Sequence, residues 1–153
     1  MSEWTYKGKP LNDADIPEKA VGFIYTIVQK STKKKYIGRK LMTMAGQKMV
    51  AGKKKKIRKE SNWKSYWSSS PWLIEYIKEH GTDDFTREII VFCEGKGSMA
   101  YIEECLLYTL GALESPNWLN ENIRSKVYRT WISKDGKTKP EIQVMRDYIK
   151  SQS

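Results

Sequence analysis

The sequence is poor in the residues that usually build metal clips and nucleophile–histidine pairs. It holds two cysteines and one histidine in 153 residues. Cys93 and Cys105 lack the close spacing of a metal clip or a redox motif, and a catalytic cysteine would have only His80 as its partner. We therefore expect two buried thiols in a reducing compartment rather than a site built on cysteine.

Long apolar runs are also missing. No stretch approaches the ~20 apolar residues that cross a bilayer, and residues 1–7 lack the apolar core of a signal peptide. These two features favour a soluble, cytoplasmic protein without a membrane partner. The length suits one domain with a core of its own.

Acidic residues are outnumbered, with 18 Asp and Glu against 28 Lys and Arg and a formal net charge of +10. Such a balance favours an anionic partner, of which nucleic acid is the commonest and an anionic membrane surface the alternative. The charge is concentrated within residues 39–62, which we expect to form a solvated, mobile loop. Its candidate DNA-binding residues are Lys53, Lys54, Lys55, Lys56, Arg58 and Lys59.

Aromatic residues follow this basic segment directly. Trp63, Tyr66 and Trp67 lie within five positions of one another. Cations that bind phosphates, together with rings that stack on bases, are typical of nucleic-acid grooves. A packed core is the alternative role for these rings.

The hydrophobic pattern predicts an α+β fold, with a short, mostly antiparallel sheet flanked by helices. Ser70 and Ser98 are placed to cap two helices, and Gly81 and Gly111 to end them. A lead-in over 1–20 should be extended, and a hairpin and helix should follow over 124–153. The expected elements are strands over 22–28, 35–38 and 85–92, helices over 71–80, 98–110 and 140–150, and a hairpin turn at 135–136.

Glu103 interrupts the apolar stripe of the second expected helix. Its neighbours at positions i−4, i+3, i+4 and i+7 are all apolar. A carboxylate placed there must be paired, bound to a metal or at the edge of the buried face, because an unpaired buried charge is costly. Glu104 remains an alternative, and so does an ordinary amphipathic helix with a different buried face.

Two tyrosines lie in the first expected hairpin. Gly22-Phe23-Ile24-Tyr25 is followed by Tyr36-Ile37-Gly38, and a helix, a strand and a second helix with Glu103 come next, before Asn120. This order resembles the layout of the GIY-YIG nucleases over about residues 21–123. The stretches 15–17 and 63–67 resemble a branch that is common in bacteriophage genomes.

The resemblance implies a metal-dependent DNA endonuclease that hydrolyses phosphodiester bonds with Mg²⁺ or Mn²⁺ as its cofactor. Tyr25 and Tyr36 would line the active site, and one of them would orient or deprotonate the attacking water. Glu103 would hold the metal. Asn120, with Asn122 as its alternative, would fix this neighbourhood by hydrogen bonding. Such parts supply the activated water, Lewis acid and cations that phosphodiester hydrolysis needs.

The arginine of the family has no clear counterpart in this sequence. Its candidates are Arg39, Lys40, Arg58 and Lys64. We favour Lys40 and Lys64, followed by Arg39, because they flank expected elements whereas Arg58 lies in the basic segment. Residues 68–70 are three serines where the family would have Gly-Ser-Ser, so the turn before the helix departs from the family pattern.

The resulting hypothesis is a phage homing-type endonuclease that acts on DNA in the cytoplasm of an infected bacterial cell. A restriction-like or DNA-degrading phage nuclease is the alternative within the class. A non-catalytic, basic nucleic-acid-binding accessory protein is the alternative outside it. A homodimer is possible, with residues 131–149 as the candidate contact.

Overall fold

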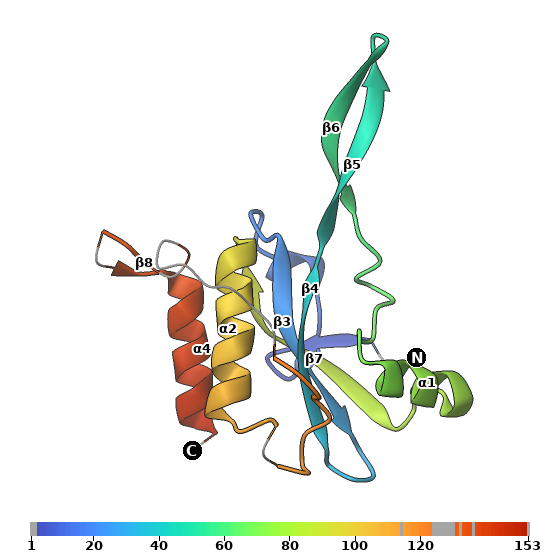
Figure 1. The fold of residues 1–153 in the computed structure, drawn as a ribbon, viewed down its shortest axis with the longest axis vertical. Helices are drawn as coiled ribbons and strands as arrows, with labels where there is room; N and C mark the ends of the chain where they lie inside the picture. Colours follow the sequence, from blue (N-terminus) through green and yellow to red (C-terminus); the bar gives the residue numbers. More distant parts are fainter. Residues whose placement is uncertain (1–2, 114, 124–130, 132, 136, 153) are drawn as a thin grey trace.

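The centre of the molecule is a mixed sheet of five strands in the order β2-β1-β7-β3-β4 (Figure 1). The computed structural model describes residues 3–113, 115–123, 131, 133–135 and 137–152. Every pairing in this sheet is antiparallel except that of β1 with β7. The strands are β1 (Trp4–Tyr6), β2 (Lys9–Pro10), β3 (Gly22–Gln29), β4 (Lys35–Leu41) and β7 (Phe85–Cys93). The predicted α+β fold with a mostly antiparallel sheet is confirmed.

In the described part of the chain, three helices cover the two faces of this sheet. Helices α2 (Lys96–Thr109) and α4 (Pro140–Ser151) lie side by side on one face, and α1 (Pro71–His80) lies on the other side (Figure 1). A short 3₁₀ turn, η1 (Asp13–Asp15), lies between β2 and β3. No helix in the described part of the chain is long and apolar enough to cross a membrane.

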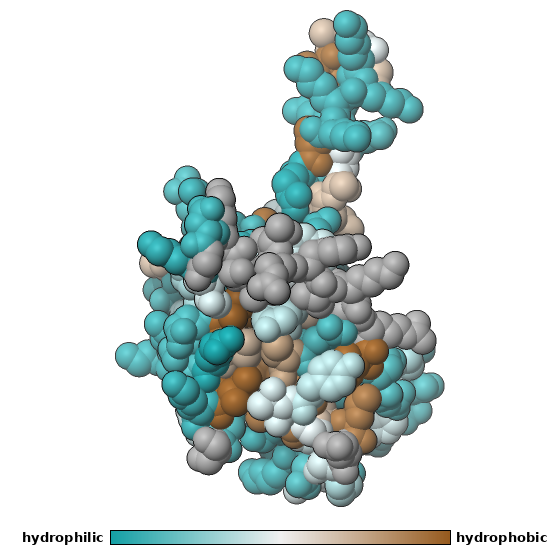
Figure 2. Space-filling view, turned by 60° about the vertical axis from the view of Figure 1, so that its left-hand side comes forward, coloured by the Kyte–Doolittle hydropathy of each residue, from teal (hydrophilic) through white to brown (hydrophobic). Residues whose placement is uncertain are grey.

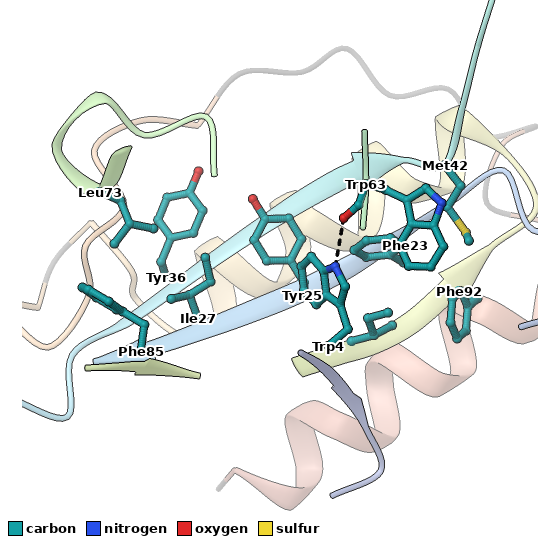
Figure 3. Packing of buried hydrophobic residues seen from close by; sticks show 11 residues of the cluster. Trp4, Phe23, Tyr25, Ile27, Tyr36, Met42, Trp63, Leu73, Phe85 and Phe92 are labelled. Atoms are coloured by element: carbon teal, nitrogen blue, oxygen red, sulfur yellow. Dashed lines mark hydrogen bonds between the residues drawn. The ribbon is translucent and has the colours of Figure 1, made fainter. Parts of the chain in front are cut away.

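The alternation of side chains along β3 divides the core in two. Phe23, Tyr25 and Ile27 enter an aromatic cluster together with Trp4 and Trp63 (Figure 3). Ile24 points to the opposite face and packs into an aliphatic cluster under α2 and α4. β3 therefore contributes side chains to both clusters. The side chains of its neighbours β4 and β7 are divided between the same two clusters.

The ends of α1 follow the sequence prediction. The Ser70 hydroxyl accepts the Leu73 N–H at 3.4 Å, and Pro71 is the first helical residue. Gly81 adopts φ 80° just after the helix, a conformation that costs a glycine little. His80 Nδ1 lies 3.2 Å from the Tyr76 carbonyl, as expected for an imidazole near a helix end.

The start of α2 differs from the prediction. Gly95 is the N-cap and the helix begins at Lys96, so Ser98 does not cap it. The Ser98 hydroxyl instead donates to Glu141 Oε1 at 2.6 Å, which ties the first turn of α2 to the first turn of α4. The N-cap therefore lies three residues earlier than predicted, at a glycine, which also serves as an N-cap.

The two ends of the chain contribute more than connections. The predicted lead-in supplies β1 and β2, and Trp4 is only 4% exposed. At the other end, α4 buries Ile142 and Met145 against the aliphatic cluster. The expected hairpin before α4 is present as β8 (Ser133–Lys134) and β9 (Lys137–Thr138), while Gly136 of its turn lies outside the described residues.

Residues 43–60 form an ordered two-stranded arm, so the prediction of a mobile loop over 39–62 was wrong. β5 (Thr43–Val50) and β6 (Lys53–Glu60) pair antiparallel over their whole length and project from the body (Figure 1). Ala51 and Gly52 join them with φ 50° and 75°, positive at both central positions as in a type I′ turn. High charge excludes burial of this segment, but it does not exclude backbone pairing.

Replacing Trp4 with alanine tests whether the first strand belongs to the domain. We expect Trp4→Ala to lower the free energy of unfolding by about 3–5 kcal/mol, because a buried ring and its hydrogen bond to the Trp63 carbonyl (2.9 Å) are lost. Chemical denaturation measures the change. Lys9→Ala on the exposed strand β2 is the control, and equal stabilities for the two variants would contradict this role.

Candidate active site

A cleft of about 770 Å³ opens beside β4, the edge strand of the five-stranded sheet. Because β4 has a strand partner on one side only, side chains from both of its faces can reach the cleft. Tyr36 and Lys40 come from the aromatic face, and Arg39 comes from the face covered by α2. The sequence-predicted catalytic residues that line the cleft are Tyr36, Arg39, Lys40, Glu103 and Asn120.

Asn120 holds the outer edge of β4 in place. Its Oδ1 accepts the Ile37 N–H at 3.0 Å, and its Nδ2 donates to the Ile37 carbonyl at 2.7 Å. The side chain thus makes both hydrogen bonds that a neighbouring strand would make. Ile37 lies between Tyr36 and Gly38, so this is the neighbourhood to which the sequence analysis assigned Asn120. Asn122 also lines the cleft.

Tyr25 lies beneath the cleft rather than on its wall. Its side chain is fully buried, and its ring packs 6.2 Å from that of Tyr36 and 6.1 Å from that of Tyr66. Burial raises the pKa of Tyr25 well above its ordinary value, and Tyr36, Tyr66 and Glu103 add to this rise. Tyr25 is therefore a neutral phenol at physiological pH and supports the tyrosine that does line the cleft.

Gly38 makes room for the Tyr25 hydroxyl. The two residues face each other across the β3–β4 ladder. A Cβ atom at position 38 would lie 2.4 Å from the Tyr25 hydroxyl oxygen and 2.9 Å from the Tyr36 ring. The phenol of Tyr25 thus passes over the backbone of β4 toward the cleft, which a side chain at position 38 would prevent.

Arg39 and Glu103 face each other across the cleft from β4 and α2. Arg39 Nε lies 3.8 Å from Glu103 Oε1, at the long end of an ion pair, and the two side chains are 37% and 20% exposed. Burial raises the pKa of Glu103 above its ordinary value, while Arg39 opposes this rise. The carboxylate is therefore only partly compensated and remains open to a further cation.

Lys40 stacks over the third tyrosine of the site. Its Nζ lies 4.3 Å from the centroid of the Tyr66 ring, a cation–π contact. Burial lowers the pKa of Lys40 from its ordinary value. Burial also raises the pKa of Tyr66 above its ordinary value. Lys40 and Arg39 together bring two cations to the cleft.

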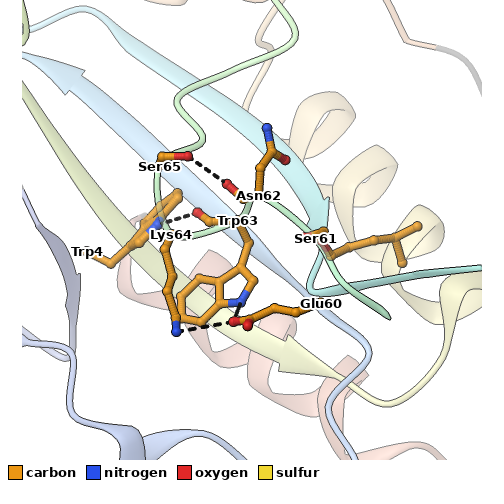
Figure 4. Close-up of polar contacts among 8 residues, drawn as sticks. Trp4, Glu60, Ser61, Asn62, Trp63, Lys64 and Ser65 are labelled. Carbon is orange, nitrogen blue, oxygen red and sulfur yellow. Dashed lines mark hydrogen bonds and ion pairs between the residues drawn. The ribbon is translucent and has the colours of Figure 1, made fainter. Parts of the chain in front are cut away.

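Two of the candidate cations lie elsewhere. Lys64 Nζ pairs with Glu60 Oε1 at 3.2 Å, and its side chain is 68% exposed (Figure 4). Glu60 also accepts the indole N–H of Trp63 at 3.1 Å, so Lys64 is held at the root of the arm and does not line the cleft. Arg58 lies on the arm and donates to Thr43 Oγ1 at 2.9 and 2.7 Å.

The comparison with known protein families shows to which family this chain belongs. Residues 4–123 match the family described as "Putative endonuclease segE, GIY-YIG domain". The chain belongs to this family. No curated protein and no solved structure gives a significant match. The match begins at Trp4, so the GIY-YIG nuclease domain includes the strand that was predicted as a lead-in.

Sequence reasoning missed two residues that shape the site of this GIY-YIG domain. Tyr66 lines the cleft, and the aromatic cluster around it was the only signal. The Arg87 guanidinium lies between the rings of Trp4 (4.4 Å) and Trp67 (4.3 Å) and donates to the Tyr66 carbonyl at 2.6 Å. No sequence pattern points to Arg87, which fixes the segment that carries Tyr66.

Adding one methyl group at Gly38 should disturb the tyrosine pair. We expect Gly38→Ala to lower the free energy of unfolding by about 1–3 kcal/mol, because the Tyr25 side chain must leave its position. Thermal unfolding and tyrosine absorption difference spectra measure the effect. Gly95→Ala adds the same methyl group at the N-cap of α2, where a Cβ atom would approach only Ser98 Oγ, at 3.4 Å, so it should leave the tyrosine difference spectrum unchanged. Normal stability of Gly38→Ala would contradict the packing described here.

The raised pKa of Glu103 predicts a gain in stability when its charge is removed. A carboxyl whose pKa is raised by folding favours the folded state at low pH, and this contribution is lost as the pH rises from its unfolded value of about 4.3 through the folded one. We expect Glu103→Gln to raise the Tm at pH 8 and the difference to shrink toward pH 4. Glu104→Gln is the control for charge, and a lower Tm of Glu103→Gln at pH 8 would contradict the expectation.

Proposed function

We propose that this chain is a metal-dependent endonuclease that hydrolyses the phosphodiester bonds of DNA. One observation carries the proposal: Tyr36, Arg39 and Glu103, from two faces of β4 and from α2, converge on one cleft. Hydrolysis of a phosphodiester needs a positioned water, positive charge for the phosphate oxygens and a site for a cation. These three side chains supply those needs within a domain of a nuclease family.

The acidic residues of the site suit a single Mg²⁺ or Mn²⁺ ion. In the described part of the chain no three His, Cys, Asp or Glu side chains gather. Magnesium commonly binds through one or two carboxylates and keeps water and substrate phosphates as its other ligands. Glu103, partly exposed to the cleft and loosely paired with Arg39, fits such a ligand. A bound ion would act as a Lewis acid on the scissile phosphate.

The other residues of the cleft divide the remaining tasks. Tyr36 carries the phenol hydroxyl that would orient or deprotonate the attacking water, and Tyr25 supports its ring from below. Arg39 and Lys40 would neutralise the charge that develops on the phosphate. Asn120 keeps the backbone between these residues in place through its two hydrogen bonds to Ile37.

The biological setting in our proposal is a phage homing-type endonuclease in the cytoplasm of an infected bacterium. The family match and the resemblance of residues 15–17 and 63–67 to the bacteriophage branch support this setting. One cleft makes one incision, so each domain should nick a single strand. A double-strand break would require two visits or a homodimer.

Removing the charge of Glu103 tests the proposal. We expect Glu103→Gln to lower the rate of nicking of supercoiled plasmid in Mg²⁺ by at least about a hundredfold, because a ligand and its charge are lost while the volume is kept. Binding of duplex DNA, measured by gel shift in EDTA, should remain. The neighbouring variant Glu104→Gln is the matched control and should nick the plasmid at close to the normal rate.

Two results would contradict the proposal. One is full activity of Glu103→Gln, and the other is a loss of activity in Glu104→Gln alone. The same time course reports the number of strands cut, because open circles should accumulate before linear product at low protein concentration. Linear product without open circles, from a protein that sediments as a monomer, would contradict a single incision per domain.

A further inference from the structure

The arm formed by β5 and β6 carries most of the net charge of the protein. Its 18 residues hold seven of the 28 basic side chains and one of the 18 acidic ones, so six units of the formal charge of +10 lie on it. Lys53 to Lys56, Arg58 and Lys59 come from β6, and Lys48 comes from β5. The residues of the arm are exposed, except for Thr43, Gly46 and Ile57, which are partly buried. The surface of the arm is hydrophilic along most of its length (Figure 2).

The charges do not stabilise the arm itself. Lys48 and Lys55 face each other directly across the two strands. Like charges in that position destabilise a pair of strands. Lys59 also folds its aliphatic chain over Gly46, where a Cβ atom would lie 2.8 Å from it. Such a ribbon gains stability when an anionic partner neutralises its lysines.

The root of the arm is fixed to the body beside the cleft. β5 continues β4 after Met42, which is 7% exposed and donates its N–H to the Val21 carbonyl at 2.9 Å. On the returning strand, the Ser61 N–H donates to the Met42 carbonyl at 2.8 Å. The strand that carries Arg39 and Lys40 therefore runs directly into the arm. Whatever the arm binds lies next to whatever the cleft holds.

The dimensions of the arm select one groove of duplex DNA. Paired strands lie about 4.8 Å apart, and their side chains make the ribbon too wide for the minor groove of about 6 Å. The major groove, about 12 Å wide, admits a two-stranded ribbon. Eight residues of strand span about 27 Å, which corresponds to about eight base pairs. Near the turn, the exposed side chains of Met49 and Val50 suit contacts with thymine methyl groups.

We propose that the β5–β6 arm lies in the major groove of duplex DNA and extends over about eight base pairs on one side of the scissile phosphate. This inference rests on the proposed function, because the DNA held by the cleft is the partner of the arm. A second copy of this chain is a poor partner for the same surface, because two arms of charge +6 would repel each other.

Methylation by dimethyl sulfate distinguishes the two grooves in one experiment. The reagent attacks N7 of guanine in the major groove and N3 of adenine in the minor groove. We expect saturating protein, in EDTA and on a mixed-sequence duplex, to protect guanine N7 several-fold more than adenine N3. Two variants should lose the N7 protection: a deletion that joins Met42 to Ser61 through an Asn-Gly turn, and a fourfold Lys→Gln variant at positions 53–56.

A matched control separates the groove contact from general charge. Lys→Gln at Lys9, Lys19, Lys33 and Lys78 removes the same charge from exposed positions on the body. The fourfold arm variant should flatten the slope of log K against log salt by about 3.6, since each of the four phosphate contacts contributes about 0.9. The body variant should change it by less than half as much. The deletion should also reduce the occluded length of duplex by about eight base pairs.

The outcomes separate this inference from the proposed function. Preferential protection of adenine N3, or unchanged N7 protection in both arm variants, would overturn the major-groove assignment even if the protein nicks plasmid normally. Equal salt slopes for arm and body variants would also overturn it. N7 protection that depends on the arm, in a protein that fails to nick DNA, would support the arm and reject the endonuclease. Thermal unfolding of each variant confirms that the body is folded.

Discussion

The register of β3 against β4 is the constraint on which the site depends. It sets Tyr25 opposite Gly38, and the strand order makes β4 the outer strand of the sheet. The missing side chain at Gly38 lets the Tyr25 phenol pass over β4, beneath Tyr36. A slip of β4 by one residue would send Tyr36 and Lys40 to the face of α2 and bring Arg39 to the aromatic face. The strand pair thus places the phenol of Tyr36 and the guanidinium of Arg39 on opposite faces of β4.

An edge strand with unpaired backbone groups tends to pair with another chain. In β4, several of these groups are hydrogen-bonded within the molecule. Asn120 occupies the backbone groups of Ile37, and the segment 117–119 binds those of Lys35. This cover ends before Arg39, where the cleft begins. The same irregular segment therefore protects one half of β4 and leaves the other half accessible. On the aromatic side of the sheet, Arg87 donates to the Tyr66 carbonyl and so holds the backbone of this cleft-lining residue in place.

The elements that could be predicted from the sequence are those in which burial makes apolar residues recur at a regular spacing. Strands near 22–28, 35–38 and 85–92 and the helix starting at Pro71 were found because apolar residues and caps recur at fixed spacings. The arm was missed because a two-stranded ribbon exposed on both faces needs no apolar alternation, and its Ala-Gly turn is a weak signal. Lys64 was favoured for its position beside Trp63, yet its partner is Glu60, four residues earlier. Arg87 escaped notice because its partners lie about 20 and 80 residues away.

Cleft and arm share one continuous backbone, and this continuity links recognition to chemistry. Arg39 and Lys40 are separated from the first residue of β5 by only Leu41 and the buried Met42. Because Met42 is held by both Val21 and Ser61, the arm cannot swing freely about this point. In our proposal, a duplex whose groove holds the arm would therefore reach Arg39 and Glu103 in a restricted orientation. Restricting orientation lowers the entropic part of a reaction barrier, so under the proposed function the arm would raise the rate of cleavage at the neighbouring phosphate without supplying a catalytic group.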